Sequence, residues 1–191
     1  MLRLLTLALM ILLPFATTQA QESGLPNPQV VIKTSEGQIT LRLFRDKAPV
    51  SVANFLAYVE SGHYNGTIFH RVIPGFMIQG GGFLPDMTEK PARDPIVNES
   101  RNRLHNVRGT VAMARTSDPD SAAAQFFINQ RSNLQLDWAP GQPGYAVFGE
   151  VTDGMSVVDY ITSSPVQTVN GHSDVPTEPV IIQEITRKSL L

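Results

Sequence analysis

Residues 69–83 of the sequence read FHRVIPGFMIQGGGF, and this stretch carries more information about the fold than any other. It places Arg71 among apolar residues, follows with the turn pair Pro74-Gly75, and sets Phe76 and Met77 shortly before a glutamine. Three consecutive glycines allow backbone to pass close to other backbone or to a ligand, because glycine has no Cβ. We therefore expect two strands, residues 68–73 and 77–80.

Hydrophobic periodicity predicts further elements on both sides of this stretch. Residues 38–44 alternate between apolar and polar side chains, which is the period of a half-buried strand, and residues 30–34 precede them across a turn. Residues 49–61 repeat apolar side chains at helical spacing, and a shorter helix is expected over residues 155–162. The remaining predicted strands cover residues 109–114, 125–129, 145–151 and 180–187. The segments expected to be loops are residues 84–108, 115–124, 133–144 and 163–178.

Many short strands with only two helices indicate a mainly β protein, either a barrel or a sandwich. The pattern alone does not separate these two architectures. Internal repeats and a second-domain linker are both absent from the sequence. We therefore expect one domain over residues 30–191.

The first twenty residues have the features of a cleavable signal peptide. Arg3 gives a short positive start, residues 4–13 are apolar, and residues 18–20 offer small side chains for cleavage. The apolar run is shorter than the roughly 20 residues that cross a bilayer. A buried N-terminal helix is the alternative, but Pro14 fits the signal peptide better. We expect residues 1–20 to be removed and residues 21–29 to form a flexible leader.

Composition argues against several classes of function. The chain has no cysteine and a formal charge of −2, so neither disulfides nor an electrostatic attraction to nucleic acid or anionic membrane is expected. The sequence lacks a G-x-S-x-G motif, and its histidines lack the spacing of metal ligands. These histidines are His63, His70, His105 and His172. We predict no metal and no cofactor.

Four segments together resemble the cyclophilins, the cyclosporin-binding peptidyl-prolyl cis/trans isomerases. The first is the stretch 69–83 itself. The others are residues 61–67 (SGHYNGT), the pair 113–115 (MAR) and 125–128 (QFFI), and the pair 145–149 (YAVFG) and 154–155 (GM). The resemblance extends over nearly the whole chain after the leader and is strongest to exported bacterial members. It implies a closed eight-stranded antiparallel β-barrel with an α-helix over each open end.

The resemblance also implies a role for individual residues. Arg71 would be the catalytic hydrogen-bond donor, and Gln79 would hold its guanidinium in place. The main chain of Ala114 and Arg115 would pair with an extended peptide, and Gln125 would contact the peptide backbone. The proline pocket would be lined by Phe76, Met77, Phe127 and Leu136, with His70 and Tyr145 on its rim.

The chemistry of this reaction requires little more than a pocket and a donor. Rotation about an X-Pro bond is slow because resonance gives the C–N bond double-bond character, with a barrier of about 20 kcal/mol. A donor that bonds to the prolyl nitrogen favours the twisted state, in which this nitrogen is pyramidal. Arginine suits this task because it stays charged and offers five N–H donors in a rigid fork.

Each of these residues also has a structural interpretation. An arginine on a strand is usually a surface or ion-paired side chain, and Gln79 and Gln125 would otherwise be polar groups bonded to backbone. Phe126 and Phe127 point to opposite faces of their strand, so one belongs to the core. For His70, a packing role without proton transfer is preferred. The loop arginines Arg101, Arg103 and Arg108 suggest either an anion site or, more often, a solvated face.

The sequence departs from the best-known members of the family at three places. Gln135-Leu136-Asp137 replaces a W-L-D segment, and Trp138 follows three positions late. Because glutamine supplies neither the apolar wall nor the indole donor, we predict weak cyclosporin binding. Tyr145 and Arg115 replace a histidine and an asparagine of animal members, as in bacterial ones.

We therefore expect a monomeric isomerase of the periplasm that acts on proline-containing unfolded or extended polypeptides and does not bind membranes after signal cleavage. One alternative is a chaperone or proline-peptide binding module with incidental catalysis. Another is a small barrel that carries an apolar ligand, but this would require small lumen-facing residues.

Overall fold

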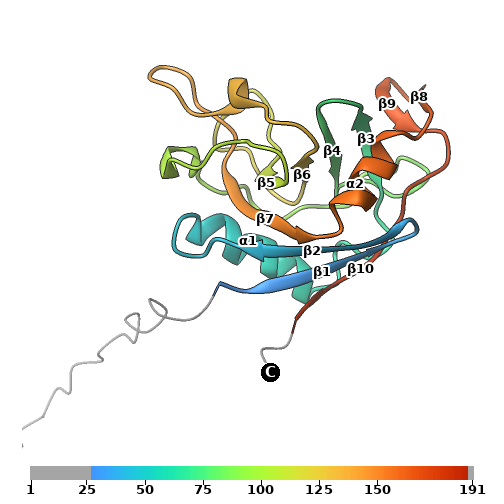
Figure 1. Cartoon of the computed structure of the whole chain (residues 1–191), viewed down its shortest axis with the longest axis horizontal. Coiled ribbons are helices and arrows are strands. Elements are labelled where there is room, and N and C mark those ends of the chain that lie inside the picture. The colour runs from blue at the N-terminus through green and yellow to red at the C-terminus, as the bar shows by residue number, and fades with distance from the viewer. Residues whose placement is uncertain (1–26, 189–191) are drawn as a thin grey trace, which may run out of the picture.

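An eight-stranded antiparallel sheet dominates the computed structural model, which describes residues 27–188 (Figure 1). Its strands are β1 (Gln29–Thr34), β2 (Gly37–Leu43), β3 (Phe69–Ile73), β4 (Met77–Gly80), β5 (Thr110–Met113), β6 (Phe126–Asn129), β7 (Val147–Asp153) and β10 (Ile182–Arg187). Their spatial order is β10-β1-β2-β7-β5-β6-β4-β3. The predicted strands all occur, with ends that differ by a few residues; β1 already begins at Gln29, which we had assigned to the leader.

The expected closed barrel is wrong, because the sheet curls into an open half-barrel. Its end strands β10 and β3 are not joined by a ladder. Among residues 27–188, the two edges are connected by a bridge between Ile68 and Ile181 and by the hydrogen bonds around it, including Phe69 N to Val180 O at 3.0 Å. From Ile182 onward β10 pairs with β1, so β3 has no strand of the sheet on its outer side.

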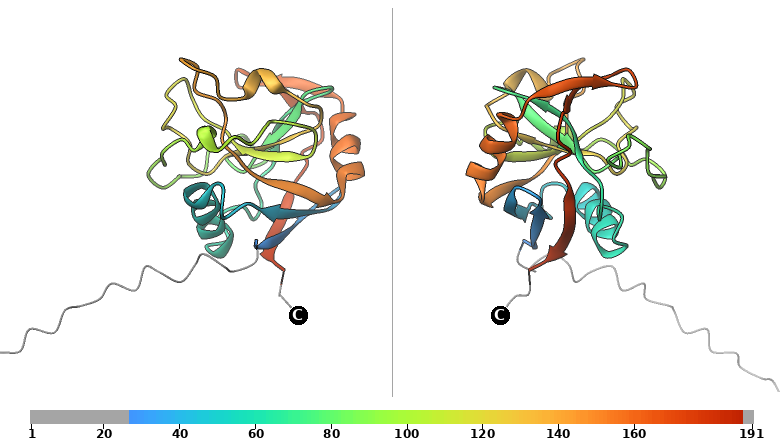
Figure 2. Two further views of the ribbon diagram at one scale, coloured as in Figure 1. Left: turned by 60° about the vertical axis from the view of Figure 1, so that its left-hand side comes forward. Right: turned by 90° about the vertical axis from the view of Figure 1, so that its right-hand side faces the viewer.

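Two α-helices lie on different sides of the curved sheet, as Figures 1 and 2 show. They are α1 (Pro49–Glu60) and α2 (Met155–Thr162), close to the predicted ranges. Helix α1 buries Phe55, whose ring lies 5.2 Å from Tyr64 and 5.4 Å from Phe126. The first turn of α1 receives no side-chain cap from Ala48; instead the distant carboxylate of Glu99 accepts hydrogen bonds from the backbone N–H groups that begin the helix.

Apolar side chains cover both faces of the sheet. Phe126 and Ile128 belong to the main core between the sheet and α1. On the opposite face, Met77, Ala112 and Phe127 form the centre of a second, smaller cluster, which we call the outer cluster. Because neighbouring residues of a strand point to opposite faces, strands β4, β5 and β6 supply side chains to both clusters.

A two-stranded hairpin occupies the segment 163–178, which we had expected to be a loop. It comprises β8 (Val166–Val169) and β9 (His172–Pro176), and its turn residues Asn170 and Gly171 have φ values of 49° and 83°. Two positive φ values at an Asn-Gly pair are typical of a type I′ hairpin turn. The Asn-Gly pair indicates a hairpin turn, but the two strands are largely exposed and their sequences do not alternate clearly between apolar and polar residues, so the sequence did not predict them. Two short 3₁₀ helices, Ser100–Asn102 and Leu134–Leu136, interrupt other predicted loops.

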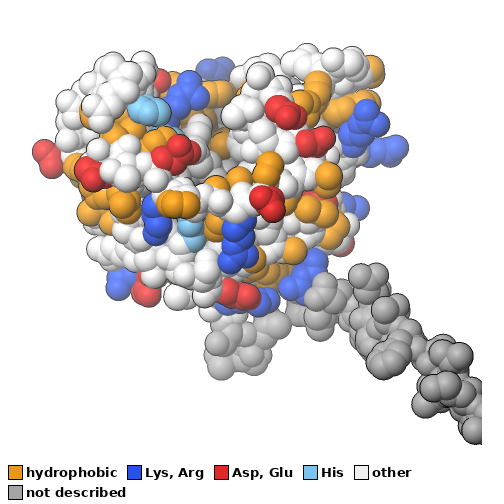
Figure 3. Space-filling view, turned by 180° about the vertical axis from the view of Figure 1, so that it is seen from behind, with side chains coloured by type: hydrophobic (Ala, Val, Ile, Leu, Met, Phe, Trp, Pro, Cys, Tyr) orange, Lys and Arg blue, Asp and Glu red, His pale blue; other side chains and the backbone are white. Residues whose placement is uncertain are grey.

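The expected signal peptide, residues 1–20, and most of the leader lie outside the described residues. Within residues 27–188, no helix has the length and apolarity needed to cross a bilayer. The face shown in Figure 3 interleaves acidic and basic side chains.

Candidate active site

Arg71 belongs to a row of side chains that crosses the sheet on its outer face. Strand register pairs Arg71 of β3 with Gln79 of β4, Gln79 with Phe127 of β6, and Phe127 with Ala112 of β5. Residues paired across antiparallel strands present their side chains on the same face. Met77 precedes Gln79 by two positions and therefore lies on this face as well.

A cavity of about 110 Å³ opens on this row and borders the outer cluster. Its volume is several times the ~30 Å³ that a water molecule occupies in the liquid, which leaves room for a small ring. The lining consists of Arg71, Phe76, Met77, Gln79, Ala114, Arg115, Phe127, Leu136 and Tyr145. The structure thus brings together nine of the eleven residues named from the sequence, from five separate segments of the chain.

The turn after β3 delivers Phe76 to this cavity. Gly75 has a φ of 71°, which favours glycine, and its N–H donates to the side chain of Gln130. The carbonyl of Phe76 accepts hydrogen bonds from Gln130 N and from Asn133 Nδ2, both at 3.0 Å. The backbone at Phe76 is therefore held by the segment that follows β6.

Three buried asparagines form a hydrogen-bond network beside the cavity, which was not predicted from the sequence. Asn106 and Asn129 are fully buried and Asn133 nearly so. Asn133 donates to Asn129 at 2.7 Å, and Asn129 donates to Asn106 Oδ1 at 3.1 Å. Asn106 in turn donates to the Tyr145 carbonyl at 3.3 Å. The network therefore connects the backbone of Phe76 with that of Tyr145, and both residues line the cavity. The available signal was Asn129 itself, a polar residue that ends an apolar strand.

The structure does not show the predicted contact between Gln79 and Arg71. Gln79 Nε2 donates instead to Gln125 Oε1 at 3.0 Å, and no hydrogen bond joins Gln79 to the guanidinium within residues 27–188. The ionic partner of Arg71 is Asp174 of β9, with Nε and Oδ2 3.7 Å apart. Gln79 and Arg71 are paired across neighbouring strands, but the hydrogen bond that Gln79 makes is to Gln125.

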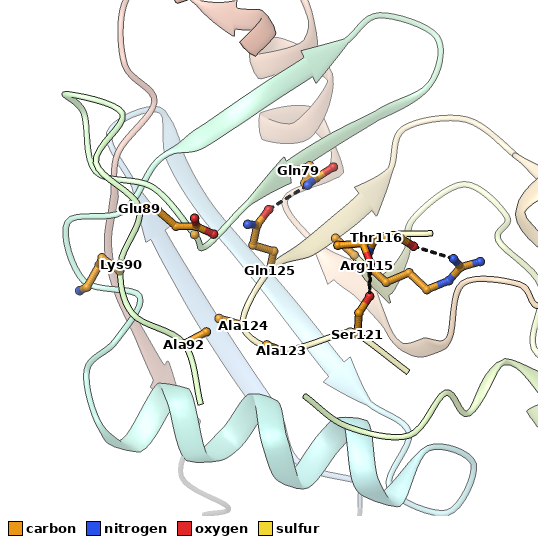
Figure 4. A pocket seen from close by; sticks show the side chains of 12 residues that line it. Gln79, Glu89, Lys90, Ala92, Arg115, Thr116, Ser121, Ala123, Ala124 and Gln125 are labelled. Atoms are coloured by element: carbon orange, nitrogen blue, oxygen red, sulfur yellow. Dashed lines mark hydrogen bonds between the residues drawn. The ribbon is translucent and has the colours of Figure 1, made fainter. Parts of the chain in front are cut away.

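A second cavity, of about 230 Å³, adjoins the first and shares Gln79, Ala114 and Arg115 with it. Gln125 lines this second cavity and not the first, and Figure 4 shows its amide reaching toward Gln79. The triple glycine permits this approach, since a Cβ at Gly82 would lie 2.6 Å from the Gln125 side chain. Gln125 is therefore placed between the two cavities.

The segment Ala114–Arg115 runs along the boundary of both cavities. Ala114 N–H donates to Gln125 O, whereas the main-chain groups of Arg115 have no hydrogen-bond partner among the described residues. The Arg115 guanidinium donates to the carbonyls of Pro143 and Gly144 and lies 4.4 Å from the centre of the Tyr145 ring. This arginine thereby holds the loop that carries Tyr145, and its backbone remains open to an extended chain.

His70 is not on the rim of the cavity, contrary to the expected position. Its side chain does not line that cavity, is 4 % exposed, and packs against the Phe83 ring at 4.6 Å. The pKa of His70 is lowered to about 4. Burial is the largest cause, and the nearby charges of His172 and Arg71 contribute to the same decrease. The strand is irregular at this point: the register of β3 with β4 shifts between Phe69 and Arg71, so His70 is an extra residue that simple alternation does not place.

The buried His70 should make the protein less stable in mild acid. Because its pKa is about 4 in the folded state and near 6.5 when unfolded, the unfolded chain binds the additional proton between these values. Stability contributed by neutral His70 is complete above pH 6.5 and declines as the pH falls toward 4, by about 3 kcal/mol in total. Chemical denaturation at pH 7 and pH 5 measures this.

The variant His70→Gln should lose this part of the pH dependence, and His172→Gln should lose a fraction of it. Equal pH dependence in His70→Gln and the wild-type protein would contradict the assignment.

The loop arginines do not form one anion site. Arg108 donates to both carboxylate oxygens of Asp159, at 2.9 and 2.7 Å. Arg101 lies over the ring of Trp138, 5.3 Å from its centre. Trp138 is 38 % exposed and does not line the cavity beside Arg71. The contacts of Arg101 and Arg108 therefore support a structural role for these side chains at the surface and not a shared anion site.

Comparisons with known proteins agree on one family. The family model for "Cyclophilin type peptidyl-prolyl cis-trans isomerase/CLD" matches residues 29–187. A peptidyl-prolyl cis-trans isomerase of Acinetobacter baylyi is 53 % identical over 167 residues, which cover 87 % of this chain and 89 % of the relative. Peptidyl-prolyl cis-trans isomerase B of Escherichia coli is 53 % identical over 161 residues, or 82 % and 98 % of the two chains.

A solved structure shares the fold as well. A cyclophilin type peptidyl-prolyl cis-trans isomerase of Cryptosporidium parvum, crystallised in the presence of the dipeptide Ala-Pro, superposes with a TM-score of 0.74 at 33 % identity. The match covers 85 % of this chain and 99 % of the other.

Proposed function

The chain belongs to the cyclophilin-type peptidyl-prolyl cis-trans isomerases, and on this basis we propose that its outer-face cavity receives the proline ring of an X-Pro segment. One observation carries the proposal: Arg71 lines the same cavity as Phe76, Met77 and Phe127. Three large apolar side chains offer a surface for the pyrrolidine ring, and a permanently charged donor stands beside it. The Ala-Pro dipeptide used with the Cryptosporidium relative has this chemistry.

In the proposed mechanism, Arg71 donates a hydrogen bond to the prolyl nitrogen as the imide twists. The planar ground state delocalises the nitrogen lone pair, so the bond strengthens only when rotation makes the nitrogen pyramidal. A turnover near 10³ s⁻¹ requires removal of about 7 kcal/mol from a barrier of about 20 kcal/mol. The apolar walls supply part of this by holding the ring while the preceding carbonyl rotates. The step needs no covalent intermediate.

The polypeptide on either side of the proline would be held along Ala114–Arg115. The main-chain groups of Arg115, which have no partner among the described residues, are available to pair with an extended chain. Gln125, placed between the two cavities, is positioned to bond to the peptide backbone. Tyr145 and Leu136 would close the rim of the proline cavity.

We further propose that the clients are exported proteins that fold in the periplasm, and that the enzyme works there as a monomer. The sequence features of residues 1–20 support export through a cleavable signal peptide. Mass spectrometry of the mature protein from a bacterial periplasmic fraction tests this, and a chain that retains residues 1–20 in the cytoplasm would contradict it.

The experiment for the activity is a protease-coupled assay on a peptide that contains Ala-Pro, since the protease cleaves only the trans isomer. We expect a rate that rises linearly with enzyme concentration. The alternative, a chaperone or binding module with incidental catalysis, predicts peptide binding and an isomerase rate that does not depend on Arg71. The assay therefore includes Arg71→Ala, and peptide binding is measured for the same two proteins.

Cyclosporin should bind weakly, with a Kd in or above the micromolar range, which corresponds to a binding free energy no more favourable than about −8 kcal/mol. Gln135 is exposed, and neither Gln135 nor Trp138 lines the cavity, so the apolar wall and indole donor of the W-L-D segment have no counterpart there. Inhibition of the isomerase assay by cyclosporin measures this, and Gln135→Trp should tighten it. Nanomolar inhibition of the unaltered protein would contradict the prediction.

A further inference from the structure

The β8–β9 hairpin lies along β3, the end strand that carries Arg71, as Figures 1 and 2 show. Val175 of β9 is buried and packs in a small apolar cluster with Ile68 and Phe83. The ring of His172 lies 5.0 Å from that of Phe83, which anchors the other end of β9. The hairpin is therefore attached to the open edge of the sheet by side chains and not by a ladder.

Asp174 occupies the position in β9 between these two anchors. Its φ of 62° is left-handed, a conformation that non-glycine residues adopt at a cost and that Asp and Asn tolerate best. Other aspartates in loops here use their carboxylates to bond to nearby backbone, as Asp86 does with Thr88 N. The carboxylate of Asp174 accepts no hydrogen bond from any residue within 27–188, so local turn geometry does not occupy it.

The carboxylate of Asp174 instead points to the guanidinium of Arg71. The closest approach is between Oδ2 and Nε, at 3.7 Å, which is an ionic contact longer than a hydrogen bond. The guanidinium makes no hydrogen bond to any described residue, so its N–H donors remain uncommitted. An anion at this distance attracts the cation without using the donors that a substrate would need.

We infer that Asp174 is a positioning residue for Arg71, which holds the guanidinium beside the cavity while leaving its outer N–H groups to the substrate. This inference rests on the proposed function of Arg71. Gln79 does not perform this task in the structure: no hydrogen bond joins it to the guanidinium within residues 27–188, and its Nε2 donates to Gln125. The hairpin thereby supplies a part of the site that strands β3 and β4 lack.

The test compares Asp174→Asn with the wild-type protein in the isomerase assay at low salt. Asparagine is isosteric and tolerates the same φ, so the fold and Tm should not change. For an exposed ion pair we expect kcat/KM to fall about two- to fivefold, mainly through kcat, because the donor acts in the transition state. Asp174→Gly, which removes any backbone strain, should show the same loss.

Salt and matched variants separate positioning from a general charge effect. Raising the salt toward 1 M, where the Debye length is about 3 Å, should lower the wild-type rate toward that of Asp174→Asn and leave the variant unchanged. Glu184→Gln removes a carboxylate of similar exposure, 3.9 Å from Lys33 and on another strand, and should behave as the wild-type protein. An independent readout is the NMR order parameter of Arg71 Nε–H, which should decrease in Asp174→Asn.

Three outcomes overturn the inference: unchanged kcat/KM in Asp174→Asn at low salt, an equal loss in Glu184→Gln, or an unchanged order parameter at Arg71. If Arg71→Ala in the same series retains the wild-type rate, it is the proposed function of Arg71 that fails.

Discussion

Arg71→Ala is expected to lower kcat/KM by about 10²- to 10³-fold, the loss that follows removal of one preorganised donor to a transition state. The side chain is about half exposed and has no hydrogen bond to the rest of the described chain, so its removal should leave the stability within about 0.5 kcal/mol. Peptide binding should change little, because the apolar walls that hold the ring remain. A loss of rate with retained binding separates the isomerase from a binding module.

Arg187→Ala is the matched control for this experiment. Arg187 also lies on an end strand of the sheet, has a side chain 47 % exposed, and pairs with Glu60 at 2.8 Å. It should retain the wild-type kcat/KM. Arg71→Lys keeps the charge but loses the planar fork, so it should recover only a small part of the activity. Full activity in Arg71→Ala would refute the donor mechanism.

Phe126→Ala and Phe127→Ala should have opposite consequences although the residues are adjacent. Phe126 is fully buried in the main core and packs edge-on against Phe55 and Tyr64, so its truncation should destabilise the protein by about 3–5 kcal/mol. Phe127 borders a cavity, so fewer contacts are lost and the destabilisation should be smaller. Its loss opens the wall of the proline cavity, and KM for Ala-Pro peptides should rise about tenfold.

Urea denaturation measures the first effect, and steady-state isomerase kinetics measure the second. The surviving folded fraction of Phe126→Ala should retain a near wild-type KM. If Phe127→Ala proved the less stable variant with an unchanged KM, the assignment of the two faces would be wrong.

Much of the local structure could be predicted from the sequence. Helices α1 and α2 follow from apolar spacing, and strand alternation places Phe126 and Phe127 on opposite faces. Arg71 could be proposed as a site residue only through its motif, because an isolated arginine on a strand has no distinguishing pattern. The position of His70 could not be predicted either: the motif names it beside Arg71, but the register of β3 shifts at this residue and its ring packs against Phe83.

The relations between distant segments could not be predicted. Gln125 accepts the hydrogen bond of the Gln79 amide, and Asp174 is the ionic partner of Arg71. Both contacts arise only in the folded chain, because folding brings β9 and the segment before β6 to the site. The open edge of the sheet has the same origin, since β10 pairs with β1 and leaves β3 to a hairpin with little apolar alternation. The buried asparagines also acquire their partners only in three dimensions.

The sequence by itself therefore determined the eight strands of the sheet, the two α-helices, the opposite faces of Phe126 and Phe127, and the family of the enzyme. These depend on side-chain periodicity and on contiguous motifs, which are local properties of the chain. The tertiary structure alone decided that the barrel stays open, which partner each polar side chain has, and how Arg71 is held. Those outcomes depend on register and on competition between groups far apart in sequence, and a hydrogen bond or ion pair forms with whichever group folding brings nearest.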